Sequence, residues 1–131
     1  MVRGNYFGVA SNGSSALGNN GAGVSVAGAN GIQVIGNVIS GNTGSGLILQ
    51  SNAQNTVVAR NIIGLNVAAS AKVGNSSYGI YLPNGNNSAI GGNGIGNTIA
   101  GNGQDGIFIS GSSTNNGIYG NFIGTNEGGS G

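Results

Sequence analysis

Cysteine, histidine and tryptophan are absent from this 131-residue chain, and only 4% of its residues are charged. The lack of cysteine excludes disulfide bonds, which fits an extracellular protein that does without them or a cytosolic one. Nucleic acid binding needs clustered cations, whereas Arg3, Arg60 and Lys72 are isolated in the sequence. No apolar run is long enough for a transmembrane helix. We therefore expect neither binding of nucleic acid nor insertion into a membrane.

Glycine and asparagine are abundant instead. The chain has 30 glycines and 22 asparagines, together about two-fifths of its residues. Such a composition without a period is typical of disordered segments. The hydrophobic fraction is 37%, however, and the net charge is only +1, whereas disordered chains usually have few apolar residues and high charge. We therefore expect a folded chain.

An internal repeat predicts the fold. Its clearest copies are Gly-Asn-Val-Ile-Ser-Gly-Asn at 36–42 and Gly-Asn-Phe-Ile-Gly-Thr-Asn at 120–126. The first asparagine of the unit recurs five times, at intervals of 32, 24, 36 and 24 residues, as Asn5, Asn37, Asn61, Asn97 and Asn121. A second apolar unit recurs at 23–26, 46–49, 79–82 and 106–109, and a third precedes most anchors, at 32–35, 56–59 and 117–119.

Three short apolar runs per repeat indicate three strands in each turn of a solenoid. Helices are disfavoured because glycine costs about 1 kcal/mol per residue relative to alanine. Stacked coils pair each strand with its counterpart in the next coil, in parallel and about 4.8 Å away. We predict an all-β parallel β-helix of about five coils with three short strands per coil, as a single segment over 1–131. A globular β-sandwich is the alternative, but it does not require asparagine at a fixed phase.

Alternation along the strands predicts which side chains point inward. One column contains Phe7, Ile39, Ile63, Ile99 and Ile123. Another contains Val2, Val34, Val58 and Ile118. The second apolar unit contributes Val24, Val26, Leu47, Leu49, Ile80, Leu82, Ile107 and Ile109.

Asparagine at the same corner of every coil suggests a ladder of side-chain hydrogen bonds. Its side chain can bond backbone groups and tolerates left-handed backbone geometry. The five anchor asparagines are the ladder candidates, with a structural role rather than a ligand site. A second row is predicted at Asn42, Asn66, Asn102 and Asn126, with Ala10 interrupting it in the first coil.

Loop lengths alternate from coil to coil. The segments 11–22 and 67–78 are long, whereas 43–45 and 103–105 have three residues each. Insertions are therefore expected at one corner of every second coil, either as a binding ridge or as plain surface loops. A smaller insertion is expected at 91–96.

The repeats at 36–42 and 120–126, together with Asp-Gly-Ile-Phe-Ile at 105–109, resemble those of right-handed parallel β-helix proteins, which include large bacterial surface and secreted proteins. The resemblance covers nearly the whole chain. It implies a right-handed coil of the pectate-lyase-like fold. It says less about function, since the class includes polysaccharide enzymes, phage tail spikes and adhesins. Its members usually carry an N-terminal cap and an export signal, neither of which we identify here, so we expect a fragment of a longer array or a subunit completed by its neighbours.

Catalytic and metal-binding groups are scarce. Asp105 and Glu127 are the only acids, at different phases of the repeat, so they are not expected to form the carboxylate pair of a glycoside hydrolase. Arg60 is a lone candidate base. The segment 101–107 partly matches a calcium-binding repeat but occurs once, with Ser45 in place of the acid in the matching coil. We expect no metal, no cofactor and no enzymatic activity, with a polysaccharide lyase or hydrolase as the alternative.

One outward-facing feature is a candidate binding surface. If alternation holds, Ile48, Tyr81 and Phe108 form an apolar stripe on the outer wall of the solenoid. Exposed apolar patches often mark interaction sites. The stripe could stack sugar rings or pack against another filament, or a loop such as 67–78 could cover it.

The two ends of the chain are at the same phase of the repeat, since Val2–Ser15 aligns with Ile118–Gly131. Uncapped parallel edges invite pairing with another chain. We therefore expect a structural or adhesive scaffold, extracellular or at the cell surface, assembling head to tail into filaments with copies of itself or with flanking repeats of a parent chain. The alternative is a carbohydrate-binding or polysaccharide-processing module with glycan partners.

Overall fold

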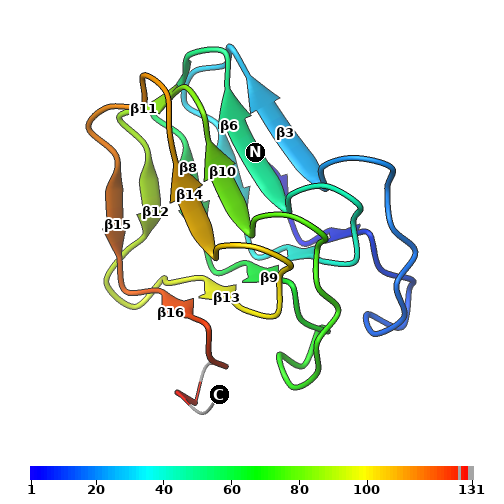
Figure 1. Ribbon diagram of the computed structural model, residues 1–131. Coiled ribbons are helices and arrows are strands. Elements are labelled where there is room, and N and C mark those ends of the chain that lie inside the picture. Colours follow the sequence, from blue (N-terminus) through cyan, green and yellow to red (C-terminus); the bar gives the residue numbers. More distant parts are fainter. Residues whose placement is uncertain (127, 130–131) are drawn as a thin grey trace.

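The computed structural model describes residues 1–126 and 128–129, so Glu127 lies outside it. Within these residues the chain forms short strands, turns and irregular segments, and no helix. The strands wind into a solenoid in which successive coils lie side by side (Figure 1). The predicted all-β parallel β-helix is confirmed.

Three parallel sheets line the solenoid. The A sheet contains β1 (Val2–Arg3), β4 (Gln33–Ile35), β8 (Val57–Ala59), β12 (Ala89–Gly91) and β15 (Gly117–Tyr119). The B sheet contains β2 (Tyr6–Phe7), β5 (Val38–Ile39), β9 (Ile62–Ile63), β13 (Thr98–Ile99) and β16 (Phe122–Ile123). The C sheet contains β3 (Val24–Ala27), β6 (Leu47–Gln50), β10 (Ile80–Leu82) and β14 (Ile107–Ile109).

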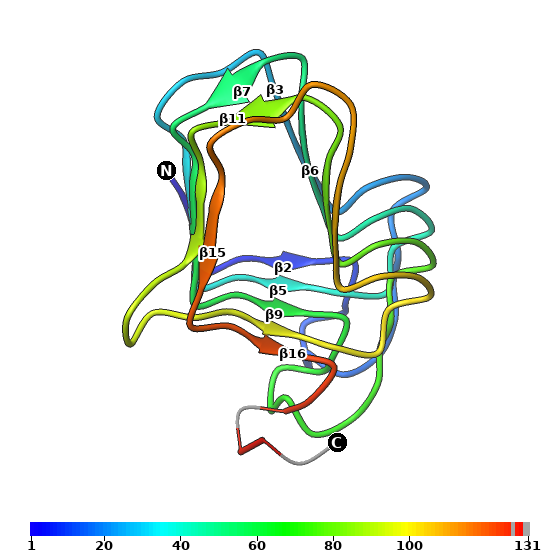
Figure 2. The ribbon, with the colours of Figure 1, turned by 60° about the vertical axis from the view of Figure 1, so that its left-hand side comes forward.

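The number of coils and of strands per coil differs slightly from the prediction. The C sheet has four strands, so the chain completes about four turns rather than five. Two coils also contain a fourth short strand between the C and A sheets, where β7 (Ala53–Gln54) pairs with β11 (Gly85–Asn86). Viewed along the axis with the C-terminal coil in front, the chain runs counterclockwise towards the viewer, which is the right-handed sense (Figure 2). Right-handed crossovers are the strong preference of parallel strands.

The strand register places similar apolar residues of adjacent coils next to each other. Val34 pairs with Val58, Ile39 with Ile63, and Leu47 with Ile80. Because neighbouring strands lie about 4.8 Å apart, each apolar side chain sits directly on its counterpart. Ile39, Ile63 and Ile99 are fully buried, which confirms the predicted column through the B sheet.

The A-sheet column contains one member that the sequence analysis missed. Ile90 is fully buried and pairs with Val58 on one side and Ile118 on the other. In the C sheet, Leu47, Leu49, Ile80 and Leu82 are likewise fully buried, as predicted. The columns therefore run through the middle coils without a gap.

The long insertions are hairpins at one corner of alternate coils. Val9 pairs antiparallel with Ala16, and Leu65 pairs antiparallel with Lys72. They begin directly after Gly8 and Gly64, so the inserted residues are 9–17 and 65–73 rather than 11–22 and 67–78. The two hairpins contact each other, since the Val67 N–H donates to the Gly13 carbonyl at 2.8 Å. They protrude together below the B sheet (Figure 2).

Candidate functional site

The anchor asparagines form the predicted ladder at the corner between the A and B sheets. The Nδ2 of Asn37 donates to Oδ1 of Asn61 at 3.0 Å, and the Nδ2 of Asn61 donates to Oδ1 of Asn97 at 2.9 Å. Each backbone N–H donates to the same Oδ1 in the next coil, at 3.0 Å in both cases. Asn5 and Asn121 extend the ladder at its two ends. The ladder therefore satisfies side-chain and backbone polar groups together.

A second ladder lies at the corner between the B and C sheets, with membership that differs from the prediction. It runs from Asn19 through Asn42 and Asn75 to Asn102, with Nδ2–Oδ1 distances of 2.9 Å at each step. Asn66 is not part of it, because its Oδ1 accepts instead from the N–H groups of Ser70 and Ala71 inside the hairpin. Asn126 follows Gly124 as Asn66 follows Gly64, so it is in phase with Asn66 rather than with the ladder.

The correct members follow the hairpin insertions rather than precede them. Ala10 does not interrupt the row, since Asn19 occupies the ladder position in the first coil. The sequence contains a usable signal, because a Gly-Asn pair occurs at 18–19, 41–42, 74–75 and 101–102. Aligning these pairs places each hairpin between two fixed points of the coil.

Both ladders are polar along the solenoid axis. Each side-chain to side-chain bond runs from Nδ2 of one asparagine to Oδ1 of the asparagine in the following coil, as in the step from Asn97 to Asn121 at 2.9 Å. Within the described residues, no donor reaches Oδ1 of Asn5, and the N–H of Asn121 has no acceptor. One end of the ladder thus presents an acceptor and the other a donor.

The C-terminal coil exposes the apolar column that the inner coils bury. The side chain of Ile123 is 47% exposed, whereas Ile99 and Ile63, one and two coils earlier, are fully buried. Ile109 and Ile118 are exposed at the ends of their own columns, at 41% and 38%. These side chains point as predicted but have no further coil to pack against within the described chain.

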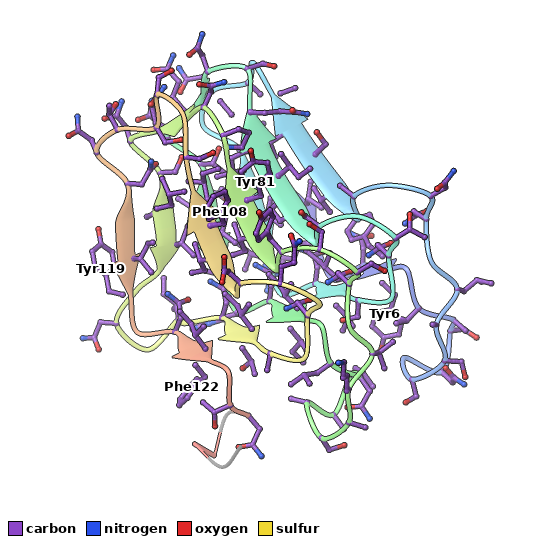
Figure 3. All side chains as sticks on the ribbon, in the orientation of Figure 1. Tyr6, Tyr81, Phe108, Tyr119 and Phe122 are labelled. Atoms are coloured by element: carbon purple, nitrogen blue, oxygen red, sulfur yellow. The ribbon has the colours of Figure 1, made fainter. Side chains whose placement is uncertain are left out.

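The outward stripe is part of an aromatic cluster on the outer wall of the C sheet. Ile48 aligns with Tyr81, and Tyr81 aligns with Phe108, so the three share a face and are half-buried. The rings of Tyr81 and Phe108 lie 5.5 Å apart between centroids (Figure 3). Tyr78, which the sequence analysis left out of the stripe, stacks on Phe108 at 4.7 Å and an interplanar angle of 15°.

Tyr78 is the last residue of the 67–78 segment, so that segment covers part of the stripe with an aromatic ring of its own. The signal for it is local. The residue before the glycine of the second apolar unit is Ala22, Ser45 or Asp105 in the other coils, and only here is it aromatic. The patch formed by Tyr78, Tyr81 and Phe108 is hereafter called the aromatic patch.

Ionisable residues are dispersed over the described part of the chain. Asp105 is exposed between the B and C sheets, whereas Arg60 lies at the corner between the A and B sheets. The described residues contain no group of three His, Cys, Asp or Glu side chains that could hold a metal ion. They also form no helix long and apolar enough to cross a membrane.

Comparison with known proteins identifies one family. Residues 2–131 match the family NosD, described as periplasmic copper-binding protein. Searches of the curated proteins and of the solved structures gave no significant match.

Proposed function

The chain belongs to the NosD family, and from this premise we propose that it is a rigid β-solenoid scaffold, structural or adhesive in role, whose ends dock onto further coils of the same kind. Such coils are supplied by other copies of the chain or by flanking repeats of a parent chain. The scaffold acts outside the cytoplasm, in the periplasm that the family description names or at the cell surface. It needs no catalytic group.

The open C-terminal coil is the observation that carries the proposal. Ile109, Ile118 and Ile123 there are between 38% and 47% exposed, although the matching side chains of the middle coils are fully buried. A second coil placed on this edge would bury them at a gain of about 25 cal/mol per Å² of apolar surface. The outer edge of a parallel sheet also exposes rows of backbone donors and acceptors.

The two edges are complementary. The sequence has the same phase at both, so Phe7 would stack on Ile123 as Ile39 stacks on Phe7 within the chain. The backbone N–H of Asn121 and Oδ1 of Asn5, neither of which has a partner among the described residues, would then meet and so extend the first ladder. A head-to-tail contact of this kind is heterologous and produces a filament when it does not close into a ring.

Edge variants test this proposal. Ile123→Lys places an ammonium group on the C-terminal edge, and Phe7→Lys does so on the N-terminal edge, where docking would bury an unpaired charge. Sedimentation velocity should show concentration-dependent assemblies for the wild type, visible as rods by electron microscopy, and monomers for each variant. Leu17→Lys is the matched control, because Leu17 is 73% exposed on a hairpin and should leave assembly unchanged.

Mixing the two edge variants makes the test sharper. Each retains one intact edge, so an equimolar mixture should form heterodimers that grow no further. Circular dichroism of each variant should match that of the wild type, because both substitutions lie in end coils. A wild-type monomer that is insensitive to dilution, or variants that assemble as the wild type does, would refute end-to-end docking between copies of this chain.

We do not propose copper binding for this chain, although the family description names it. Copper sites are built from thiolate, thioether and imidazole ligands, and this sequence has no cysteine, no histidine and a single methionine, Met1. The donor set therefore does not fit a copper site. We expect no retention of Cu(I) against a chromophoric chelator, and stoichiometric retention would contradict this.

A second candidate function is binding of carbohydrate at the aromatic patch. Three rings with centroids 4.7 to 5.5 Å apart form a platform on which a sugar ring could stack. Binding on a glycan array should be lost in Tyr81→Ala and Phe108→Ala with assembly unchanged. Tyr119→Ala is the control, because Tyr119 is a 57% exposed tyrosine on the A sheet. Equal binding by all three variants would exclude the patch.

A further inference from the structure

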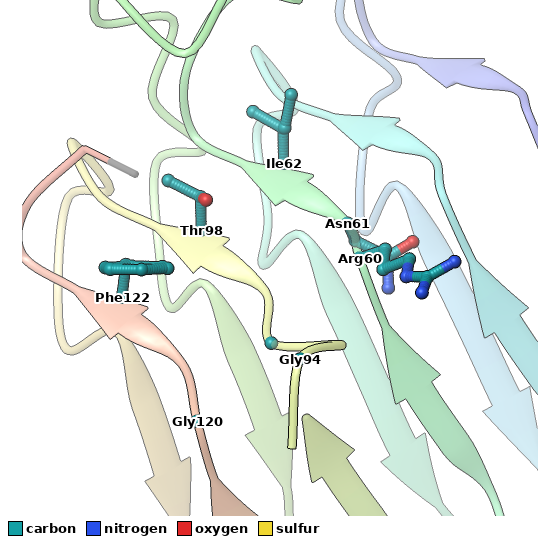
Figure 4. A pocket seen from close by; sticks show the side chains of 8 residues that line it. Arg60, Asn61, Ile62, Gly94, Thr98, Gly120 and Phe122 are labelled. Atoms are coloured by element: carbon teal, nitrogen blue, oxygen red, sulfur yellow. The ribbon is translucent and has the colours of Figure 1, made fainter. Parts of the chain in front are cut away.

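A groove of about 510 Å³ lies on the outer wall of the B sheet. Its floor is formed by outward side chains of adjacent strands, Ile62 on β9, Thr98 on β13 and Phe122 on β16. Arg60 and the glycine-rich segment around Gly94 border it, and Figure 4 shows Arg60 and Phe122 on opposite sides of Gly94. The volume is within the range of small-molecule sites, about 300–1,000 Å³.

Arg60 is held in a backbone conformation that does not suit it. Its φ is +54°, in the left-handed region. The corresponding corner residues of three other coils are Gly4, Gly36 and Gly120, with φ between +66° and +69°, whereas Gly96, before Asn97, is not in this region. Glycine adopts this conformation freely, whereas a residue with a side chain is strained there. Such strain is typically found at functional sites, where the side chain compensates for its cost through its role.

The groove offers hydrogen-bond donors without acidic side chains. The Arg60 guanidinium makes no ion pair or hydrogen bond with any described residue, and Arg60 is exposed. Within the same part of the chain, the N–H groups of Gly94 and Gly96 on the groove wall also have no acceptor. None of the residues that line the groove is acidic. The site is therefore complementary to an anion.

We propose that this groove binds a small organic anion in which a carboxylate is attached to a ring. The Arg60 guanidinium would pair with the carboxylate through two parallel N–H donors, a geometry that a carboxylate matches. The ring would lie over the apolar floor formed by Ile62 and Phe122. The groove is on the side wall, so the proposal does not depend on end-to-end docking or on the aromatic patch.

The test uses two anions and their neutral counterparts. Benzoate and glucuronate represent an aromatic and a sugar carboxylate, and benzamide and glucose are the matched neutral probes. Titration into ¹⁵N-labelled protein should shift the amide resonances of Gly94, Gly96 and Thr98 with at least one anion and with neither neutral probe. The anion that binds more tightly shows whether the ring of the ligand is aromatic or a sugar.

Arg60→Gly is the decisive variant, because it restores the residue that fits this corner in other coils. We expect at least tenfold weaker anion binding together with a melting temperature equal to or above that of the wild type. Arg60→Lys keeps the charge but loses the paired donors, so its affinity should be intermediate. Arg3→Ala removes a different exposed cation and should leave binding unchanged.

Three outcomes would overturn the proposal. The first is the absence of shifts with both anions at millimolar concentration. The second is equal binding of the neutral probes, or equal anion binding by Arg60→Gly. The third is a lower melting temperature for Arg60→Gly, because Arg60 would then stabilise the coil rather than strain it.

Discussion

The corner that precedes the B strands and the corner that precedes the A strands perform the same task with different side chains. At the first, the N–H of Asn61 donates to Oδ1 of Asn97 at 3.0 Å. At the second, the N–H of Thr56 donates to Oγ of Ser88 at 3.2 Å, and the N–H of Ser88 donates to Oδ1 of Asn116 at 3.0 Å. At both corners, a side-chain oxygen of one coil accepts a hydrogen bond from a backbone N–H of the neighbouring coil.

The two corners differ in the hydrogen bonds that their side chains donate. Every asparagine amide in the first ladder also donates, so each coil is bonded to both neighbours. Thr56 is fully buried, yet its Oγ1 has no hydrogen-bond partner in the described part of the chain. The register places Ile32 at the matching position of the preceding coil, and its side chain offers no polar group. An asparagine amide has two N–H donors besides its acceptor oxygen, so it can bond to the coils on both sides, whereas a hydroxyl has a single donor, which Ser88 uses on the Asn86 carbonyl of its own coil.

Asn61→Ala should cause the largest effect. Asn61 is 1% exposed and bonds to Asn37, Asn97 and the carbonyl of Val34. Its removal takes the Asn61 partner from the N–H and Nδ2 of Asn37 and from the Val34 carbonyl, and one of two donors from Oδ1 of Asn97. Each buried group left without a partner costs about 1–3 kcal/mol. We expect a loss of about 3 kcal/mol or more in the free energy of unfolding, measured by urea denaturation. Asn93→Ala, at an exposed loop asparagine, is the control, and an equal effect of both would remove the energetic role of the ladder.

Removal of an asparagine from the second ladder should show an intermediate effect, with an asparagine outside the ladder for comparison. Asn75 is 1% exposed and links Asn42 to Asn102, whereas Asn66 bonds only within its hairpin. Asn75→Ala should cost about 2–3 kcal/mol because buried groups lose partners, and Asn66→Ala about 1 kcal/mol because its bonds are at the surface. Urea denaturation of both variants measures the difference. Equal losses, or a larger loss for Asn66→Ala, would mean that the ladder does not hold the coils together.

The same contrast explains what could be predicted from the sequence. The first ladder and the column of Ile39, Ile63 and Ile99 repeat with one residue type, so their phase is visible without a structure. Ile90 was missed because an insertion between Gly91 and Gly96 separates it from its anchor, Asn97, by more residues than in other coils.

The candidate sites were harder to predict, because they depend on residues that break the repeat. Tyr78 occupies a regular position of the repeat, after the hairpin, but the residue type there changes from coil to coil, with Ala22, Ser45 and Asp105 at the matching positions. Arg60 borders its groove only because the 92–95 insertion, one coil away in space, folds back beside it, so that the Arg60 N–H donates to the Ile95 carbonyl at 3.1 Å. A residue type that occurs in one coil only, or a contact made by an insertion, leaves no periodic signal in the sequence.

Thr56→Val should have the smallest effect, and of opposite sign. Valine has nearly the same shape as threonine and removes the one buried hydroxyl that has no partner among the described residues. An unpaired buried polar group costs about 1–3 kcal/mol, part of which the substitution should recover, so we expect stability to rise by about 1 kcal/mol. Urea denaturation measures this gain, with exposed Thr43→Val as the control expected to change little. A loss of stability in Thr56→Val would show that the hydroxyl is satisfied in solution by a buried water, which needs several polar partners. The corner that precedes the A strands would then be as fully hydrogen-bonded as the asparagine corner that precedes the B strands. The two corners would differ only in whether one residue type repeats in the sequence.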